Sequence, residues 1–259
     1  MKTMMTVAGS DSSGGAGIQA DIKTATALGV FATSTITSIT AQNTTGVQAI
    51  FDLDAEVVRE EIRSILSDIP PDAVKIGMVS APEIIKTIAE ELKGYEGPVV
   101  LDPVMVSTSG SPLLKEEAMD SLKSLLFPRA TLLTPNIPEA ELLTGKRITS
   151  VAAQEEAAKA LYEAYGASAL VKGGHGTGRA VDVFYDGKIH HYEKPMLDNP
   201  NTHGTGCTLS SAIASFLALG LGEAKAVEEA KNYVYDAIAD GLDLGRGRGP
   251  INHMVRRNK

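Results

Sequence analysis

The sequence predicts an α/β fold in which helices cover both faces of a mostly parallel central sheet. Short apolar runs alternate along the 259 residues with stretches of helical periodicity. The runs lack a regular alternation of apolar and polar residues, which is typical of strands buried on both faces. Strands that alternate with helices favour a doubly wound sheet, whose ligands bind beyond the carboxyl ends of the strands. We expect one domain over residues 1–259.

The apolar runs are predicted to be the strands of this sheet. They are Met4–Ala8, Ala32–Thr40, Ala73–Ile76, Val99–Leu101, Thr131–Leu133, Ala169–Val171 and Val181–Tyr185. The residues that directly follow each strand are therefore the ones to examine for function.

The helices are predicted from apolar periodicity and from the residues at their ends. In Asp54–Ile69 the apolar residues fall on one helical face. Ser80-Ala81-Pro82-Glu83 predicts a capping box, with a proline near the first turn, at the start of the next helix. Further helices are predicted for Leu114–Phe127, Gln154–Tyr165 and Ala224–Leu242.

Charge and cysteine content limit the partners and the chemistry. The chain has 24 Lys and Arg against 32 Asp and Glu, a net charge of −8, so nucleic acid is not an expected partner. Only Leu244–Lys259 is basic, as a solvated terminus or as a region that attracts nucleotides. No apolar run approaches the ~18 residues of a membrane span, so no membrane association is expected. Cys207 is the only cysteine, which excludes an intrachain disulfide and is compatible with a reducing cytoplasm.

The segment after the first strand is rich in glycine. Within it, Gly15–Ala20 matches the dinucleotide-binding pattern G-x-G-x-x-A, but Ser34–Asn43 contains no acidic residue to bind a ribose. Two interpretations stay open: a flexible turn between strand and helix, or a backbone that lies close to a small ligand.

Single side chains of chemical interest follow the next three strands, and each has a structural alternative. Gln42 presents a planar amide that matches an aminopyrimidine edge, or it caps a turn. Met78 lines a flat apolar ring or packs in the core. Asp102 ligates Mg²⁺ or caps its own loop.

The fifth and sixth strands are followed by residues suited to phosphates. Asn136 and Glu139 stand three residues apart at the start of a helix, where they suit a hydrated Mg²⁺ or simply favour the helix N-terminus. Lys172 precedes two glycines and suits a phosphate oxygen.

The segment Asn201–Thr208 is the strongest local feature. It is rich in glycine and leads into a helix, so several backbone N–H groups point to one place and make an anion site. In such a field the pKa of Cys207 is expected to fall below its usual ~8.5. A buried and inert cysteine is the alternative.

Taken together, these segments resemble the ribokinase-like superfamily and, within it, the hydroxymethylpyrimidine/phosphomethylpyrimidine kinases. The resemblance covers nearly the whole chain and rests on Ala8–Asp21, Ala41–Thr44, Lys75–Met78, Leu101–Met105, Thr134–Glu139, Val171–His175, Asn201–Thr208 and Gly249–His253. It implies a kinase that uses ATP and Mg²⁺ in thiamine biosynthesis. The substrate would be 4-amino-5-hydroxymethyl-2-methylpyrimidine and then its monophosphate. The resemblance also suggests a homodimer.

The resemblance further implies a role for each candidate residue. Gln42 would pair with the pyrimidine edge. Asp102 and Glu139 would organise Mg²⁺, and Cys207 would stand where the family has its base. The pocket would be lined by Gly9, Ala16, Asp21, Met78 and Val104; the nucleotide phosphates would meet Asn136, Lys172 and Thr205; and the anion hole would be formed by Gly204, Thr205, Gly206 and Cys207.

Three other functions compete with this interpretation. A pyridoxal kinase of the same superfamily would share Cys207 and the anion hole but phosphorylate a substituted pyridine. A nicotinamide-dependent dehydrogenase would use Gly15–Ala20, against which the missing acidic residue counts. A thiol enzyme would use Cys207 as a covalent nucleophile with His203 as its partner.

Overall fold

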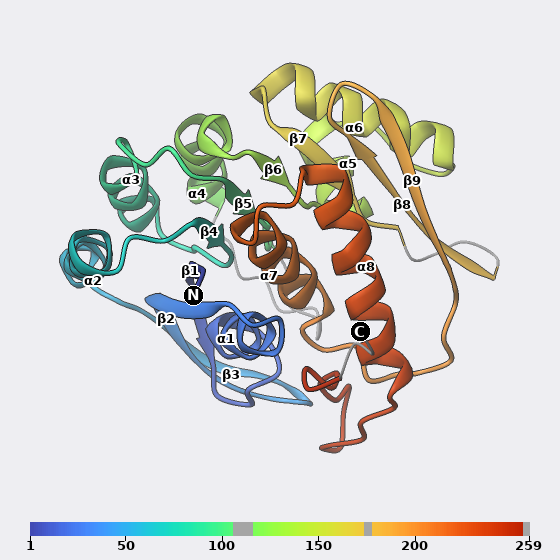
Figure 1. The fold of residues 1–259 in the computed structure, drawn as a ribbon, viewed down its shortest axis with the longest axis horizontal. Helices are drawn as coiled ribbons and strands as arrows, with labels where there is room; N and C mark the ends of the chain where they lie inside the picture. The colour runs from blue at the N-terminus through green and yellow to red at the C-terminus, as the bar shows by residue number, and fades with distance from the viewer. Residues whose placement is uncertain (106–115, 174–177, 256–259) are drawn as a thin grey trace.

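The computed structural model describes residues 1–105, 116–173 and 178–255, and its described strands form one nine-stranded sheet in the order β3-β2-β1-β4-β5-β6-β7-β8-β9 (Figure 1). The strands are β1 (Thr3–Asp11), β2 (Phe31–Asn43), β3 (Gly46–Asp52), β4 (Ala73–Ile76), β5 (Val99–Leu101), β6 (Leu132–Leu133), β7 (Ser168–Val171), β8 (Arg179–Tyr185) and β9 (Ile189–Pro195). The strands from β2 to β7 run parallel, and β3, β8 and β9 are antiparallel additions at the two edges. The predicted mostly parallel sheet is confirmed.

Helices cover both faces of this sheet. They are α1 (Gly17–Ala27), α2 (Ala55–Asp68), α3 (Pro82–Glu91), α4 (Glu116–Ser121), α5 (Ile137–Thr144), α6 (Val151–Tyr165), α7 (Thr205–Ala218) and α8 (Glu223–Ala239), with a short π turn and a 3₁₀ turn over 122–129. None of the described helices is long and apolar enough to cross a membrane.

Neighbouring residues of each strand point to opposite faces, so the sheet separates two layers of apolar packing. In β5, Val99 and Leu101 pack with α2, α3 and α4, whereas Val100 packs with α7 and α8. In β7, Ala169 and Val171 pack with α5 and α6. Both faces of the central strands are thus apolar, which is why their sequences read as continuous apolar runs.

The sequence located β4 and β5 to the residue and missed the two edge strands β3 and β9. Most of β3 is exposed, and β9 is largely polar, so neither shows the apolar run of a buried strand.

Two expectations about helix starts need adjustment. Ala81, not Ser80, is the N-cap of α3, and Ser80 donates its hydroxyl to Asp52 instead. The first residues of the helix predicted at Leu114 lie outside the described residues, and the described helix begins at Glu116.

Candidate active site

A pocket of about 700 Å³ opens at the carboxyl edge of the parallel strands. Because these strands are parallel, the segments that follow them meet at one edge of the sheet. The pocket brings together nearly all of the candidate residues. They are Gly9, Ala16, Gln42, Met78, Asp102, Val104, Asn136, Glu139, Lys172, Gly204, Thr205, Gly206 and Cys207.

Asp21 is the one candidate that does not reach the pocket. Its side chain is fully buried behind the wall, where it accepts hydrogen bonds from Thr6 and Ser211 and pairs with the equally buried Lys75 at 2.7 Å. The expectation that Asp21 lines the pocket is therefore wrong. Asp21 sits on the face of α1 that packs against the sheet, and it neutralises a lysine there.

Asp11, at the end of β1, organises the glycine-rich loop that follows. Its carboxylate accepts the backbone N–H groups of Ser13, Gly15 and Ala16 at 2.8, 3.2 and 2.8 Å, and the ring of His203 at 2.8 Å. Although burial works in the opposite direction, the bonds from His203 and Ser13 lower the pKa of Asp11 to about 2. Asp11 thus joins the first loop of the chain to the loop before α7.

These two loops touch so closely that only glycine fits at their contact. A Cβ on Gly204, whose φ is +82°, would lie 1.8 Å from the carbonyl oxygen of Gly15. A Cβ on Gly15 would lie 2.5 Å from the ring of His203. The glycines are therefore required by packing as well as by backbone conformation.

The N-terminus of α7 forms the floor of the pocket. Gly204 is its N-cap and supplies no side chain to cap the helix. The N–H groups of Gly206 and Cys207 belong to the first turn, where a helix offers no acceptor of its own. They are available to an anion.

Cys207 differs from its expected chemistry. Burial raises the pKa of its thiol to about 11, and the nearby Lys75 lowers it less than burial raises it. The expectation of a lowered pKa considered only the helix N-terminus; the surrounding protein removes water from the thiol and favours its neutral form.

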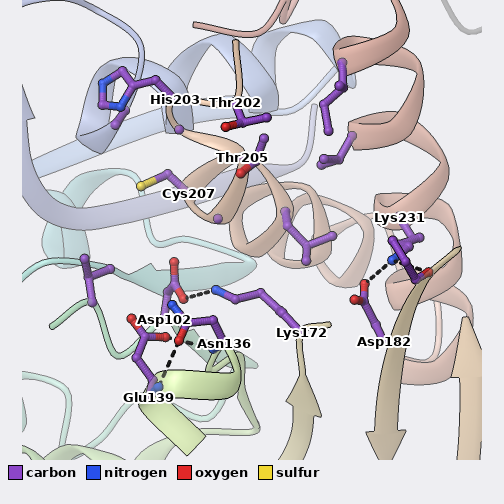
Figure 2. Close-up of a pocket in the computed structure, with 18 of the residues that line it drawn as sticks. Asp102, Asn136, Glu139, Lys172, Asp182, Thr202, His203, Thr205, Cys207 and Lys231 are labelled. Carbon is purple, nitrogen blue, oxygen red and sulfur yellow. Dashed lines mark hydrogen bonds and ion pairs between the residues drawn. The ribbon is translucent and has the colours of Figure 1, made fainter. Parts of the chain in front are cut away.

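Asp102 and Lys172 form a charged pair that faces α7 across the pocket (Figure 2). The Lys172 ammonium donates to Asp102 Oδ1 at 2.8 Å, and the hydroxyl of Thr134 donates to the same oxygen at 3.0 Å. Asp102 Oδ2 and Lys172 Nζ lie 3.5 and 3.4 Å from where a Cβ on Gly206 would be. Burial disfavours the charged lysine, but Asp102 and Glu139 raise its pKa.

Asn136 and Glu139 form a reciprocal capping box at the start of α5. The Asn136 side chain accepts the Glu139 N–H, and the Glu139 carboxylate accepts the Asn136 N–H, both at 2.8 Å. Burial raises the pKa of Glu139 to about 7, and Lys172 opposes that shift. The structural interpretation of this pair is confirmed, and the same two side chains also line the pocket.

The donor set suits a loosely held magnesium ion. Among the described residues, no three His, Cys, Asp or Glu side chains gather into a metal cluster. Two carboxylates, Asp102 and Glu139, line the pocket beside Lys172. Mg²⁺ usually takes one or two carboxylates and completes its shell with waters and substrate phosphates, so the residues fit this ion.

The sequence patterns did not predict the part of the pocket that lies beyond Lys172. The lining residues there are Lys194 of β9, Met196 and Leu197 just after it, and Tyr235 of α8. In the same region Lys231 of α8 pairs with Asp182 of β8 at 2.6 Å (Figure 2). Recognising β9 as a strand would have directed attention to the residues after it.

His203 does not support the thiol-enzyme hypothesis. Its ring is held by Asp11 and lies near Gln42, so the expected partner of Cys207 is engaged elsewhere.

The phosphomethylpyrimidine kinase family model matches residues 11–252. A hydroxymethylpyrimidine/phosphomethylpyrimidine kinase of Streptomyces coelicolor is 49% identical over 251 residues, which cover 96% of this chain and 93% of that protein. The bifunctional thiamine biosynthesis protein ThiED of Geobacter sulfurreducens is 47% identical over 98% of this chain, which spans 52% of that protein.

The fold is shared with a solved vitamin kinase. An ADP complex of Bacillus subtilis pyridoxal kinase superimposes with a TM-score of 0.90, at 37% identity, over 98% of this chain and 97% of that one. This likeness confirms the expected ribokinase-like fold. Because the family model spans residues 11–252 and the Streptomyces relative matches 96% of the chain, the chain belongs to the phosphomethylpyrimidine kinase family.

Proposed function

We propose that this pocket transfers the γ-phosphoryl group of ATP to 4-amino-5-hydroxymethyl-2-methylpyrimidine, and then to the monophosphate, in thiamine biosynthesis. The observation that carries the proposal is the convergence of Lys172, Asp102 and the first turn of α7 in a pocket that also holds Gln42. Although the chain has a net charge of −8, Lys172 and the N-terminus of α7 together place positive charge at this point of the pocket. Phosphoryl transfer depends mainly on such positioning and charge stabilisation.

The substrate half of the pocket is assigned to residues of β1 and β2, to the N-cap of α1 and to the loops that follow β4 and β5. Gln42 reads the pyrimidine edge with its amide, as Gln reads adenine. Gly9 lies where the register between β1 and β2 shifts, and it leaves room for a flat ring. The ring contacts are completed by Ala16, Met78 and Val104.

The phosphate half is assigned to Lys172, Asn136 and the anion hole of Gly204–Cys207. The hydroxyl oxygen of the substrate attacks the γ-phosphorus and its proton passes to the thiolate of Cys207, while the bond to the β,γ-bridging oxygen breaks and ADP leaves. Lys172 and the N–H groups of Gly206 and Cys207 stabilise the charge on the transferred group. Thr205 contributes its hydroxyl at the same helix start.

Asp102 and Glu139 would hold Mg²⁺ beside the nucleotide phosphates. The ion would neutralise part of the triphosphate charge during transfer. Asp102 also forms an ion pair with Lys172, so the buried ammonium has a partner when no phosphate is bound.

The direct test follows products by mass after incubation with Mg-ATP. One reaction contains the hydroxymethylpyrimidine, and a parallel reaction contains pyridoxal. We expect a monophosphate and then a diphosphate of the pyrimidine. Phosphorylated pyridoxal alone would assign the protein to the competing activity, and monophosphate without diphosphate would remove the second step.

We also propose that residues 1–259 act as one kinase domain in the cytoplasm, where ATP is available, and that two copies pair through the β2–β3 hairpin. Ile39 and Phe51 lie opposite each other on neighbouring strands and are 42% and 69% exposed. Exposed apolar side chains on an edge hairpin are typical of an interface.

A further inference from the structure

The amide of Gln42 lies between two polar neighbours that are both engaged elsewhere. Its Nε2 is 3.4 Å from Nε2 of His203, and its Oε1 is 3.3 Å from the hydroxyl of Thr40. Each distance alone would suggest a hydrogen bond. The protons available to these neighbours decide whether either bond forms.

The His203 Nε2 carries a proton that points to Asp11. The two atoms are 2.8 Å apart, and Asp11 is ionised at neutral pH because its pKa is about 2. An ionised carboxylate only accepts hydrogen bonds, so Nε2 of His203 must be the donor. A protonated Nε2 has no lone pair left to accept the Gln42 amide.

The single hydroxyl proton of Thr40 is also used. Thr40 donates to the carbonyl oxygen of Ser10 at 2.8 Å, a shorter contact than the one to Gln42. A hydroxyl has one proton, so Oε1 of Gln42 receives none from Thr40.

The ring of His203 has little freedom to change this arrangement. Only 5% of His203 is exposed. Its ring packs against Gly15, and its backbone bridges to Pro250. The Asp11 oxygen that holds the ring also accepts two loop N–H groups.

We propose that His203 is a positioning residue, which confines the Gln42 amide sterically while leaving its N–H and C=O groups free for the substrate. The inference rests on the proposed function, in which Gln42 reads the pyrimidine. The free Oε1 accepts from the 4-amino group, and the free Nε2 donates to the adjacent ring nitrogen. Specificity for an aminopyrimidine then arises because the protein leaves this amide unsatisfied until the substrate arrives.

The test compares two substrates, the hydroxymethylpyrimidine and its analogue without the 4-amino group. The measured quantity is the preference, which is the ratio of their kcat/KM values. Gln42→Ala is expected to lower the preference at least tenfold. His203→Leu is expected to lower it about five- to tenfold, because Leu cannot donate to Asp11 and is not fixed in place, so the substrate must then order a loose amide. His203→Gln is expected to keep the preference within twofold of the unmodified chain, since a Gln N–H near the place of Nε2 can donate to Asp11 and fix the side chain there.

His253→Leu is the matched control. His253 is a second buried histidine, and it contacts Thr208 in the first turn of α7. This variant is expected to melt at a lower temperature with an unchanged preference, and combining His203→Leu with Gln42→Ala should add nothing to the loss from Gln42→Ala.

The outcomes separate the inference from the proposed function. If Gln42→Ala abolishes the preference and His203→Leu keeps it, the positioning role is wrong and the assignment of Gln42 stands. If His203→Leu and His253→Leu lower the preference equally, a general loosening of α7 explains both, and the proposal is overturned. An unchanged preference in Gln42→Ala removes the assignment of Gln42 itself, whatever the mass assay shows about kinase activity.

Discussion

The thiol of Cys207 is held in an environment that favours its neutral form. The thiolate is the species that reacts with iodoacetamide, and the pKa of this thiol is about 11. Alkylation is therefore expected to be slow at pH 7 and to rise about tenfold per pH unit up to about pH 10. Because Cys207 is the only cysteine, the mass of a single adduct measures it directly. The urea-unfolded chain, with a thiol pKa near ~8.5, is the control, and a native rate that levels off near that pH would contradict the burial argument.

The two phosphoryl transfers make different demands on Cys207. In the first, an alcohol must lose its proton; in the second, the attacking phosphate oxygen is already ionised near neutral pH. Only the thiolate of Cys207 can accept that proton, and because the pKa of the thiol is about 11, the share of thiolate rises with pH. Cys207→Ser is therefore expected to slow the first transfer by ~10²–10⁴-fold at alkaline pH and the second by much less. Single-turnover rates at saturating substrate measure each step. Equal losses would leave Cys207 as part of the anion hole without a role in proton transfer.

The residues proposed to bind ligands were predictable because they lie at or just after the end of a strand: Asp102 and Lys172 directly follow β5 and β7, and Gln42 is the next-to-last residue of β2. Gln42, Asp102 and Lys172 all line the pocket where the sequence placed them. The pairing of Asp11 with His203 was not predictable, because the two residues are 192 positions apart and only the fold brings them together. Asp21 was misassigned for the same reason, since it lies on α1 and its partner Lys75 comes from β4.

The helix α7 meets the glycine-rich loop through Gly204, and this contact is expected to tolerate no side chain. Gly204→Ala would force an alanine into the left-handed backbone conformation and would place its Cβ against the carbonyl oxygen of Gly15. Gly220, just beyond the other end of α7, has φ +91° and nothing within 4 Å of an added Cβ. Gly220→Ala is thus expected to cost only the ~1–2 kcal/mol of the backbone conformation and to keep its activity. Gly204→Ala is expected to lose more stability than Gly220→Ala and to lose most of its kinase activity. Thermal melts and reaction rates measure both effects. Equal stability and activity of the two variants would show that the backbone shifts to relieve the clash.

The C-terminal segment Gly249–His253 supports α7 from behind. The N–H of His203 donates to the Gly249 carbonyl, and the ring of His253 contacts the Thr208 hydroxyl at 3.0 Å. These contacts give the last motif of the sequence a structural role in holding the anion-hole loop.

Burial of His253 is expected to make the fold sensitive to acid. Burial lowers the pKa of His253 from 6.5 to about 4, so the folded state binds this proton less readily than the unfolded chain. The resulting stability is present above pH 6.5 and is lost as the pH falls toward 4, on the order of 3 kcal/mol in total. Urea unfolding at several pH values measures this loss. His253→Leu should be less stable at pH 7, and its unfolding free energy should change less between pH 6.5 and pH 4. An unchanged pH dependence would assign the acid sensitivity to other groups.

The edge strands of the sheet were the part of the fold that could not be predicted from the sequence. The strands β3 and β9 complete antiparallel hairpins, so much of their surface is exposed and their sequences carry few buried residues. Helices with one apolar face were located well, and α2 begins and ends within one residue of its predicted bounds. The hydrophobic pattern of a sequence predicts elements that are buried, and it gives no signal for an element that is largely exposed.

At the scale of the whole molecule, topology builds the site. Parallel strands bring Gly9, Met78, Asp102 and Lys172 to one edge of the sheet although they span most of the sequence. The N-terminus of α7, from the last third of the chain, closes this edge (Figure 1). The protein carries a net charge of −8, so the positive field that binds phosphates is local and depends on this convergence.

The exposed apolar pair on the β2–β3 hairpin gives a prediction about assembly. Ile39 and Phe51 share one face of the sheet edge, and a second copy would remove both from water. Phe51→Glu would place a charge in this contact, so the variant is expected to sediment at the monomer mass of 27.2 kDa while the unmodified chain sediments at twice that mass. Leu142→Glu is the matched control, because Leu142 is 60% exposed on α5 and should leave the dimer intact. A dimer that survives Phe51→Glu would place the interface elsewhere, and a monomeric unmodified chain would rule out the pairing at the concentrations tested.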